Sequence, residues 1–224
     1  MNYLSVDRIA KSFGDRVLFK DLSFGLSRGD KVALIAQNGT GKSSMLEIIC
    51  GNEVADEGQV VMRNGVRVGY LRQEPLFDET FTISEVLEKS NSLFRNLLTE
   101  FENVSHNVDG LNNVEHEKAL EEITTKMEVL QAWDYEDRLK QLLGKFKIHD
   151  LNQRISSLSG GQKKRLSLAI VLLDNPELLI LDEPTNHLDV EMIEWLEKHL
   201  GQSNTTLLMV THDRYFLDRV CNQI

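Results

Sequence analysis

The sequence predicts an α/β fold whose parallel sheet is interrupted by a helical insertion. Residues 31–35 favour a buried strand, which a glycine-rich turn and an apolar helical run follow. Residues 178–182 form a second apolar run, and this one ends in adjacent carboxylates. In α/β proteins, the carboxyl ends of buried parallel strands present polar groups to a ligand. Residues 74–155 instead carry helical periodicity, which predicts the insertion.

The first 72 residues are rich in β signals. Apolar and polar side chains alternate over residues 3–6 and 16–19, around a turn at residues 14–15. Such alternation favours antiparallel strands. An Asn-Gly pair at residues 64–65 separates two further apolar runs, and this pair is a strong signal of a β-hairpin. The sequence therefore predicts an antiparallel β subdomain with a second hairpin at Asn-Gly.

From residue 82 the apolar residues recur at helical spacings on both sides of a polar, turn-rich segment at residues 107–113. The simplest arrangement is an antiparallel helical hairpin over about residues 84–132. Arms of about 20 residues would reach about 30 Å. This stretch holds ten Asp and Glu against four Lys and Arg, a net charge of −6. A solvated helical pair and a partner-binding arm both fit this pattern.

Helix and strand alternate again after the insertion. Ser159 is placed to cap a helix that ends at the Asp-Asn-Pro sequence of residues 174–176. Residues 205–210 favour a strand, and residues 212–220 favour the start of a helix. The sequence then stops without a polar tail, and we expect a truncated C-terminal end.

Composition excludes several classes of protein. The 224-residue chain has a net charge of −10, which argues against broad attraction to nucleic acid, because neutralising phosphates needs clustered Lys and Arg. Two cysteines cannot form a disulfide framework, and the six histidines show no metal-ligand spacing. No apolar run approaches the length of a membrane span. We expect a cytoplasmic protein without membrane insertion.

The glycine-rich turn matches a phosphate-binding P-loop. Its glycines let backbone N–H groups point into the loop, the helix N-terminus adds partial positive charge, and the lysine supplies a full charge to the phosphates. The serine after it would carry its hydroxyl to Mg²⁺. An unliganded turn is the alternative, and the acidic strand downstream argues against it. The residues expected to bind ATP here are Ala36, Gln37, Asn38, Gly39, Thr40, Gly41, Lys42, Ser43 and Ser44.

Ala36 stands where the motif has its first glycine. A negative φ at this residue would make the change nearly free, whereas a positive φ would cost about 1 kcal/mol. We therefore expect a distorted but working loop.

The residues that follow the strands predicted at 178–182 and 205–210 complete a hydrolytic site. Hydrolysis of ATP requires neutralised phosphates, a placed water molecule and a group that orients or deprotonates it. Asp182 is expected to hold Mg²⁺ and Glu183 to act as the base. His212 is placed to contact the γ-phosphate, with a plain strand-end residue as the alternative. For an isolated carboxylate pair, a structural role is the alternative.

Three further motifs follow in order: Leu-Ser-Gly-Gly-Gln at 158–162, an apolar strand with Asp-Glu-Pro at 178–184, and Thr-Asn-His-Leu-Asp at 185–189. With the P-loop, they make the chain resemble the nucleotide-binding domain of an ATP-binding-cassette (ABC) protein over nearly its whole length. The resemblance implies a Mg-dependent ATPase with a P-loop NTPase fold. A RecA-like core with an antiparallel β subdomain would span 1–73 and 156–224, and a helical subdomain with the hairpin arm would span 74–155.

The resemblance also implies roles for single residues. Phe13 would stack on adenine, with a core aromatic as the alternative. Gln73 would be a catalytic residue that also contacts the metal, with an ordinary surface residue as the alternative. The metal ligands would thus be Ser43, Gln73 and Asp182. A second cassette, in the same full-length chain or in a homodimer, would receive in trans Ser159, Gly160, Gly161, Gln162 and Asp189. One cassette alone is thus expected to be a weak ATPase.

Within this superfamily the chain most resembles the ABC-F branch, soluble tandem-cassette ATPases associated with translating ribosomes. Asn186 and His187 and the run at 214–218 carry this likeness, as does the separation of 86 positions from Gln73 to Ser159. The likeness implies the first of two cassettes, of the Uup-like type with a short arm, and the ribosome as target. The alternatives are a membrane-transporter ATPase subunit, a DNA-maintenance ABC ATPase and a slow nucleotide-dependent binding module.

Overall fold

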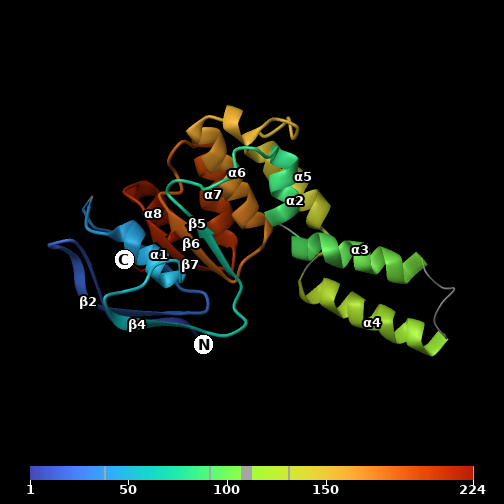
Figure 1. The fold of residues 1–224 in the computed structure, drawn as a ribbon, viewed down its shortest axis with the longest axis horizontal. Coiled ribbons are helices and arrows are strands. Elements are labelled where there is room, and N and C mark those ends of the chain that lie inside the picture. Colours follow the sequence, from blue (N-terminus) through green and yellow to red (C-terminus); the bar gives the residue numbers. More distant parts are fainter. Residues whose placement is uncertain (38, 91, 107–112, 131, 224) are drawn as a thin grey trace. The chain divides into compact units, whose positions relative to one another are not determined.

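The chain folds into two compact units, whose elements are drawn in Figure 1. One unit holds Met1–Pro75 and Lys163–Ile224, and the other holds Leu76–Gln162. An antiparallel sheet, a parallel sheet and helices share the first unit, which confirms the predicted α/β class with its antiparallel β subdomain. This computed structural model describes residues 1–37, 39–90, 92–106, 113–130 and 132–223.

The antiparallel sheet has the strand order β2-β1-β4. Its strands are β1 (Asn2–Phe13), β2 (Arg16–Ser27) and β4 (Glu57–Met62). The pairing of β1 with β2 ends at Phe13 opposite Arg16, next to a tight turn in which Gly14 has φ of 57°. This left-handed conformation favours glycine. The turn predicted at residues 14–15 is thus confirmed.

The hairpin predicted at the Asn-Gly pair of residues 64–65 is wrong. A turn is present, since the Val66 N–H donates to the Arg63 carbonyl at 3.4 Å. The next strand, β5 (Val68–Leu71), leaves β4 and pairs parallel with β6 (Leu178–Asp182) in the other sheet. A Cβ on Gly69 would lie 2.8 Å from the Pro176 side chain. The strand β5 can therefore pack this closely only because residue 69 has no side chain. Long-range packing overrides the local turn signal.

The parallel sheet has the order β3-β7-β6-β5, with β3 at Lys31–Leu34 and β7 at Thr206–Val210. Every residue of β6 and β7 is buried, as expected for central strands covered on both faces. Leu34 pairs with Val210, and Val210 with Asp182, so neighbouring strands end at the same level. The carboxyl ends of these strands therefore lie together at one edge.

Among the described residues, four helices belong wholly or mostly to the first unit. The helices are α1 (Lys42–Ile49), α6 (Gly160–Leu173), α7 (Val190–Gln202) and α8 (Arg214–Val220). In the first of these, α1, Leu46 and Ile49 share one apolar core with Leu4 of β1 and with Ile180 and Leu208 of the parallel sheet. The helix α1 therefore packs against strands of both sheets.

The second unit is helical. It contains α2 (Ile83–Ser90), α3 (Ser92–His106), α4 (Asn113–Val129), α5 (Tyr135–Lys145) and a short 3₁₀ turn, η1 (Ile155–Ser157). Figure 1 shows α3 and α4 running side by side as a hairpin. Their buried side chains include Leu97, Ile123 and Met127, and Lys126 Nζ lies 4.0 Å from Glu100 Oε1.

The packed hairpin is narrower than the stretch of about 84–132 expected from the sequence, because α2 is a separate helix. The first turn of α2 is hydrogen-bonded to another segment of the second unit, because the Ile83 and Ser84 N–H groups donate to the carbonyls of Gln153 and Leu151 respectively. Most of the expected polar tip lies outside the described residues. Throughout the described part of the chain, no helix combines the length and the apolar character that crossing a membrane requires.

Candidate functional site

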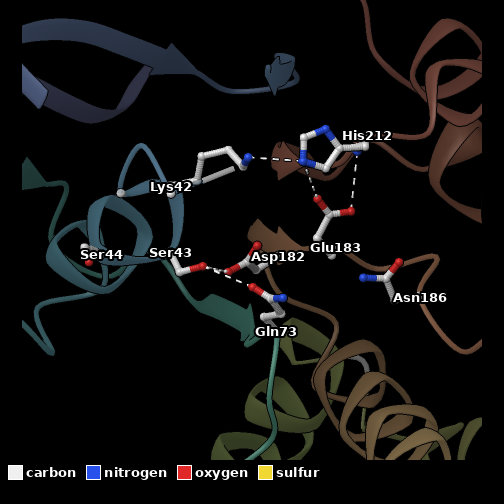
Figure 2. Close-up of a pocket in the computed structure, with 10 residues that line it drawn as sticks. Lys42, Ser43, Ser44, Gln73, Asp182, Glu183, Asn186 and His212 are labelled. Carbon is white, nitrogen blue, oxygen red and sulfur yellow. Dashed lines mark hydrogen bonds and ion pairs between the residues drawn. The ribbon is translucent and has the colours of Figure 1, made fainter. Parts of the chain in front are cut away.

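The carboxyl edge of the parallel sheet surrounds one cavity of about 460 Å³. Figure 2 shows side chains from the P-loop and from the ends of β5, β6 and β7 directed toward it. Nine of its lining residues were predicted site residues, and the tenth, Asn186, was not. The lining residues are Gly39, Gly41, Lys42, Ser43, Ser44, Gln73, Asp182, Glu183, Asn186 and His212.

Two glycines shape the P-loop. Gly39 and Gly41 have φ of 77° and 85°, the left-handed region that other residues rarely adopt. A Cβ on Gly41 would lie 2.8 Å from the Leu18 Cβ, so this position also needs the space. Gly41 precedes the first turn of α1, where backbone N–H groups and the helix dipole favour anions.

The rest of the loop is held by polar contacts. The Thr40 hydroxyl donates to the Gln37 carbonyl at 2.8 Å, and the Arg16 guanidinium donates to the Gly39 carbonyl at 2.9 Å. Ala36 is not among the described residues with positive φ, so its methyl group causes no left-handed strain. The penalty considered for this departure from the motif does not arise. Asn38 lies outside the described residues.

The Lys42 ammonium is directed back over the loop. It donates to the carbonyls of Ala36 and Gln37 at 2.7 and 3.1 Å, and its Nζ lies 3.2 Å from His212 Nε2. These partners are neutral acceptors, and charged phosphate oxygens form stronger, charge-assisted hydrogen bonds. The ammonium is therefore placed to exchange loop carbonyls for a phosphate.

Glu183 and His212 form a second pair in the cavity. Glu183 Oε1 lies 3.5 Å from His212 Nε2, and the His212 backbone N–H donates to Glu183 Oε2 at 3.4 Å. The same Nε2 cannot both accept from Lys42 and donate to Glu183. With Nε2 unprotonated the ring accepts from Lys42, whereas with a proton on Nε2 it donates to Glu183. The proton on this ring selects its partner.

The backbone of Glu183 is strained. Its φ is 48°, which costs a non-glycine residue about 1–3 kcal/mol. Its N–H still donates to the Val210 carbonyl at 2.8 Å, so the strained residue remains joined to β7. The side chain is buried and is directed toward His212 (Figure 2).

Oxygen atoms from three elements meet at Ser43. The Ser43 hydroxyl donates to Asp182 Oδ2 at 2.6 Å, and Gln73 Oε1 lies 3.4 Å from the same hydroxyl. Burial raises the pKa of Asp182, and the hydrogen bond from Ser43 opposes this rise. In the described part of the chain, no three His, Cys, Asp or Glu side chains gather as a metal cage. Hydroxyl, amide and carboxylate oxygens nevertheless suit Mg²⁺, which usually completes its shell with phosphates and water.

Sequence reasoning missed Lys164. Its side chain is 1% exposed, and its ammonium donates to the Asp182 carbonyl at 2.8 Å, the Gln73 carbonyl at 3.2 Å and the Arg72 carbonyl. Burial lowers its pKa to about 8. A signal existed, because Lys164 shares one helical face with the buried Leu168 and Val171.

Asn186 was also missed as a site residue. Its N–H lies 3.4 Å from the Glu183 carbonyl, so a turn after the strand returns it to the cavity. The turn-forming Pro-Thr-Asn sequence that follows Glu183 was a signal for this return.

Other predicted residues lie outside the cavity lining. Phe13 is 81% exposed at the end of β1, which excludes the core alternative. Asp189 caps α7, accepting the Met192 N–H at 3.0 Å. In the second unit, Gln162 N donates to the Ser159 hydroxyl at 3.2 Å and Ser159 N to Gln162 Oε1 at 2.9 Å, a capping box at the start of α6. Gly160 and Gly161 form its first turn.

The chain matches the ABC transporter family over residues 19–186. It is 39% identical to the uncharacterized ABC transporter ATP-binding protein YfmR of Bacillus subtilis, over 100% of this chain and 36% of that protein. It is 34% identical to the energy-dependent translational throttle protein EttA of Mycobacterium tuberculosis, over 98% of this chain and 39% of that protein. The chain thus spans well under half the length of these relatives.

Solved structures share the fold. The ATP-binding subunit of an ABC transporter aligns with a TM-score of 0.71 and 23% identity, over 98% of this chain and 83% of that one. A putative metal-chelate type ABC transporter in an inward-facing conformation aligns with a TM-score of 0.62 and 21% identity, over 99% of this chain and 77% of that one. At these identities the likeness shows the fold alone.

Replacing Lys42 with alanine should weaken ATP binding by about tenfold or more, because a hydrogen bond from a charged donor contributes about 1.5–3 kcal/mol. Titration calorimetry with ATP and Mg²⁺ measures the loss. The control is Lys198→Ala, which removes an exposed lysine of α7. Unchanged affinity in Lys42→Ala would rule out the P-loop assignment, and an equal loss in both variants would indicate a general charge effect.

Proposed function

Because the chain belongs to the ABC transporter family of ATP-binding domains, we propose that it binds ATP with Mg²⁺ at the carboxyl edge of its parallel sheet and hydrolyses the γ-phosphate bond. One observation carries the proposal. The P-loop lysine, a buried carboxylate pair and a histidine come from different strand ends and line the same cavity (Figure 2). Transfer of a phosphoryl group to water needs positive charge that neutralises the phosphates, a base and a group that contacts the γ-phosphate.

Binding of ATP uses the loop and its surroundings. Backbone N–H groups of residues 39–44 and the Lys42 ammonium take the phosphates. Phe13 stacks on adenine. Two observations support this role: the ring is exposed, and its cross-strand neighbour Arg16 donates to the Gly39 carbonyl of the P-loop. An exposed aromatic face beside a phosphate site suits a nucleobase.

Hydrolysis uses the residues after β6 and β7. Mg²⁺, when bound, neutralises phosphate charge, and Ser43, Asp182 and Gln73 would hold it. Glu183 accepts a proton from the attacking water or orients it, because its carboxylate is buried and directed into the cavity. His212 contacts the γ-phosphate through Nε2, the atom that now faces Lys42. Its choice between Lys42 and Glu183 depends on its protonation.

A second cassette completes each site. The Ser159 hydroxyl and the backbone N–H groups at the start of α6 form an anion site in the second unit, which we assign to ATP bound by another cassette. Asp189 joins it from the start of α7. The second cassette belongs to the same longer chain or to another copy of this one. An isolated cassette is therefore a weak ATPase.

The biological setting we favour is translation. The relatives named for translational throttling align over nearly the whole of this chain at 34% identity, whereas the transporter structures are less than 25% identical. We propose a cytoplasmic ABC-F protein that acts on the ribosome, with this chain as its first cassette. A transporter ATPase subunit is the alternative, which the name of YfmR and the two transporter structures also fit. A DNA-maintenance ATPase is a further alternative, without a specific observation in its favour.

Glu183→Gln should keep ATP binding and lower the rate of phosphate release at least about 100-fold, because it removes the base but not the phosphate contacts. The control is Glu194→Gln on the exposed face of α7. In the longer tandem protein, the same variant should accumulate in the ATP-bound form and co-sediment with ribosomes. Wild-type turnover in Glu183→Gln would remove this residue from the chemistry, and loss of ATP binding would make its role structural.

Hydrolysis per chain should rise with protein concentration, because each site needs a signature motif from a second cassette. Complementation gives the sharper measurement. Lys42→Ala lacks its own phosphate site and Ser159→Arg lacks its signature, so each should be inactive alone. Their mixture should regain activity through one intact composite site. Full activity of a dilute, monodisperse monomer would contradict the composite site.

The α3–α4 hairpin should be needed for ribosome binding but not for ATP binding. Replacing residues 91–128 in the tandem protein with a short Gly-Ser linker should keep ATP affinity and abolish co-sedimentation. The acidic charge of the arm favours a basic protein surface over rRNA phosphates as its target. Exchanging the exposed Glu121 and Glu122 for Gln keeps the hairpin and lowers only its charge. Retained co-sedimentation after excision would mean that other surfaces dock.

A further inference from the structure

Gln73, an exposed residue on the loop that follows β5, lines the cavity next to Ser43. We infer that Glu47 of α1 is a positioning residue: by gripping Arg72 it holds the Gln73 side chain against Ser43 and thereby sets the affinity of the site for a divalent cation. The inference rests on the proposed binding of ATP and Mg²⁺, and it adds a residue that lies outside the cavity lining.

Glu47 contacts the Arg72 guanidinium through both carboxylate oxygens. Arg72 Nε lies 3.0 Å from Glu47 Oε1, and Arg72 Nη2 donates to Glu47 Oε2 at 3.0 Å. A planar guanidinium and a carboxylate joined in this way fix direction as well as distance. Both side chains are half-buried, with exposed fractions of 31% and 24%.

Glu47 is itself held in place. The Tyr70 hydroxyl donates to Glu47 Oε1 at 3.2 Å, and the Asn52 amide donates to Glu47 Oε2 at 2.8 Å. A tyrosine hydroxyl is protonated at neutral pH and can donate, and burial raises the pKa of Tyr70 further. The carboxylate therefore has one orientation to offer to the guanidinium.

The backbone of the same pair of residues is fixed from α6. The Lys164 ammonium donates to the carbonyls of Arg72 and Gln73 and, on the next strand, of Asp182. Side chain and backbone at the end of β5 are thus held by different helices. The Gln73 side chain extends from this fixed backbone to the Ser43 hydroxyl, which lies 3.4 Å from its Oε1.

The spacing of Ser43 and Glu47 on α1 explains how the Glu47–Arg72 contact acts on Gln73. Ser43 and Glu47 are four residues apart, so they lie on one face of that helix. They contact Gln73 and Arg72 respectively, which are neighbours in the chain. The serine that would hold the cation and the glutamate that aligns the amide are therefore parts of one rigid turn. A contact next to a metal ligand commonly tunes the affinity for the metal without touching it.

The experiment measures cation affinity rather than activity. The chain is saturated with a non-hydrolysable ATP analogue in the absence of metal, and Mg²⁺ is then titrated by calorimetry. Glu47→Gln keeps the shape of the side chain and removes its charge. It should weaken Mg²⁺ binding by about tenfold, the lower end of the effect of removing a metal ligand's supporting contact. Affinity for the metal-free analogue should stay unchanged.

Two further variants separate positioning from stability. Glu197→Gln removes a different Arg–Glu contact of the same unit, in which Arg219 Nη1 and Glu197 Oε2 lie 2.7 Å apart, and should leave Mg²⁺ affinity unchanged. The reversed pair Glu47→Arg with Arg72→Glu should regain most of the affinity lost in Glu47→Gln. Thermal unfolding should differ little among the variants, because partly exposed ion pairs contribute little to stability.

The outcomes distinguish the inference from the proposed function. If the wild-type chain fails to bind the ATP analogue, the proposed function fails. If it binds both analogue and Mg²⁺ but Glu47→Gln binds Mg²⁺ as tightly, only the inference is overturned. An equal loss in Glu197→Gln, or no recovery in the reversed pair, overturns it as well.

Discussion

Parallel pairing in one register is the constraint on which the site depends. The strands β3, β7 and β6 end level with one another because Leu34 pairs with Val210 and Val210 pairs with Asp182. Residues that are far apart in the chain are thereby delivered to one edge. The hydrogen bond from Ser43 to Asp182 then joins the P-loop helix to the central strand, so the phosphate site and the carboxylates form one structure.

The charges at this edge are balanced over very short distances. Asp182 and Glu183 bring two carboxylates to the end of a fully buried strand, and Lys164 places an ammonium against the carbonyl of the first. Burial of an unpaired charge is costly, and it shifts the pKa of Lys164 to about 8. Three carbonyl acceptors nevertheless satisfy its donors. The same cation therefore joins the ends of β5 and β6 and offsets part of the negative field there.

Local patterns predicted much of this arrangement. The P-loop, the apolar strand before Asp182 and the strand before His212 are continuous in sequence, so their chemistry could be recognised there. The fate of β5 could not, because the turn at residues 64–65 is compatible with either sheet and only packing beside β6 decides it. The carbonyl partners of Lys164 and the pairing of Glu47 with Arg72 were also hidden, because these contacts join residues that are distant in sequence.

The left-handed backbone of Glu183 has a consequence for how the domain can change. A glycine at this position would relieve strain worth about 1–3 kcal/mol, partly offset by the greater entropy that glycine has in the unfolded chain. The same exchange would delete the carboxylate. Selection for thermal stability alone would thus drive this residue away from glutamate. If Glu183 is the base that we propose, selection for turnover would keep it there, and one substitution would give a stabilised but inactive cassette.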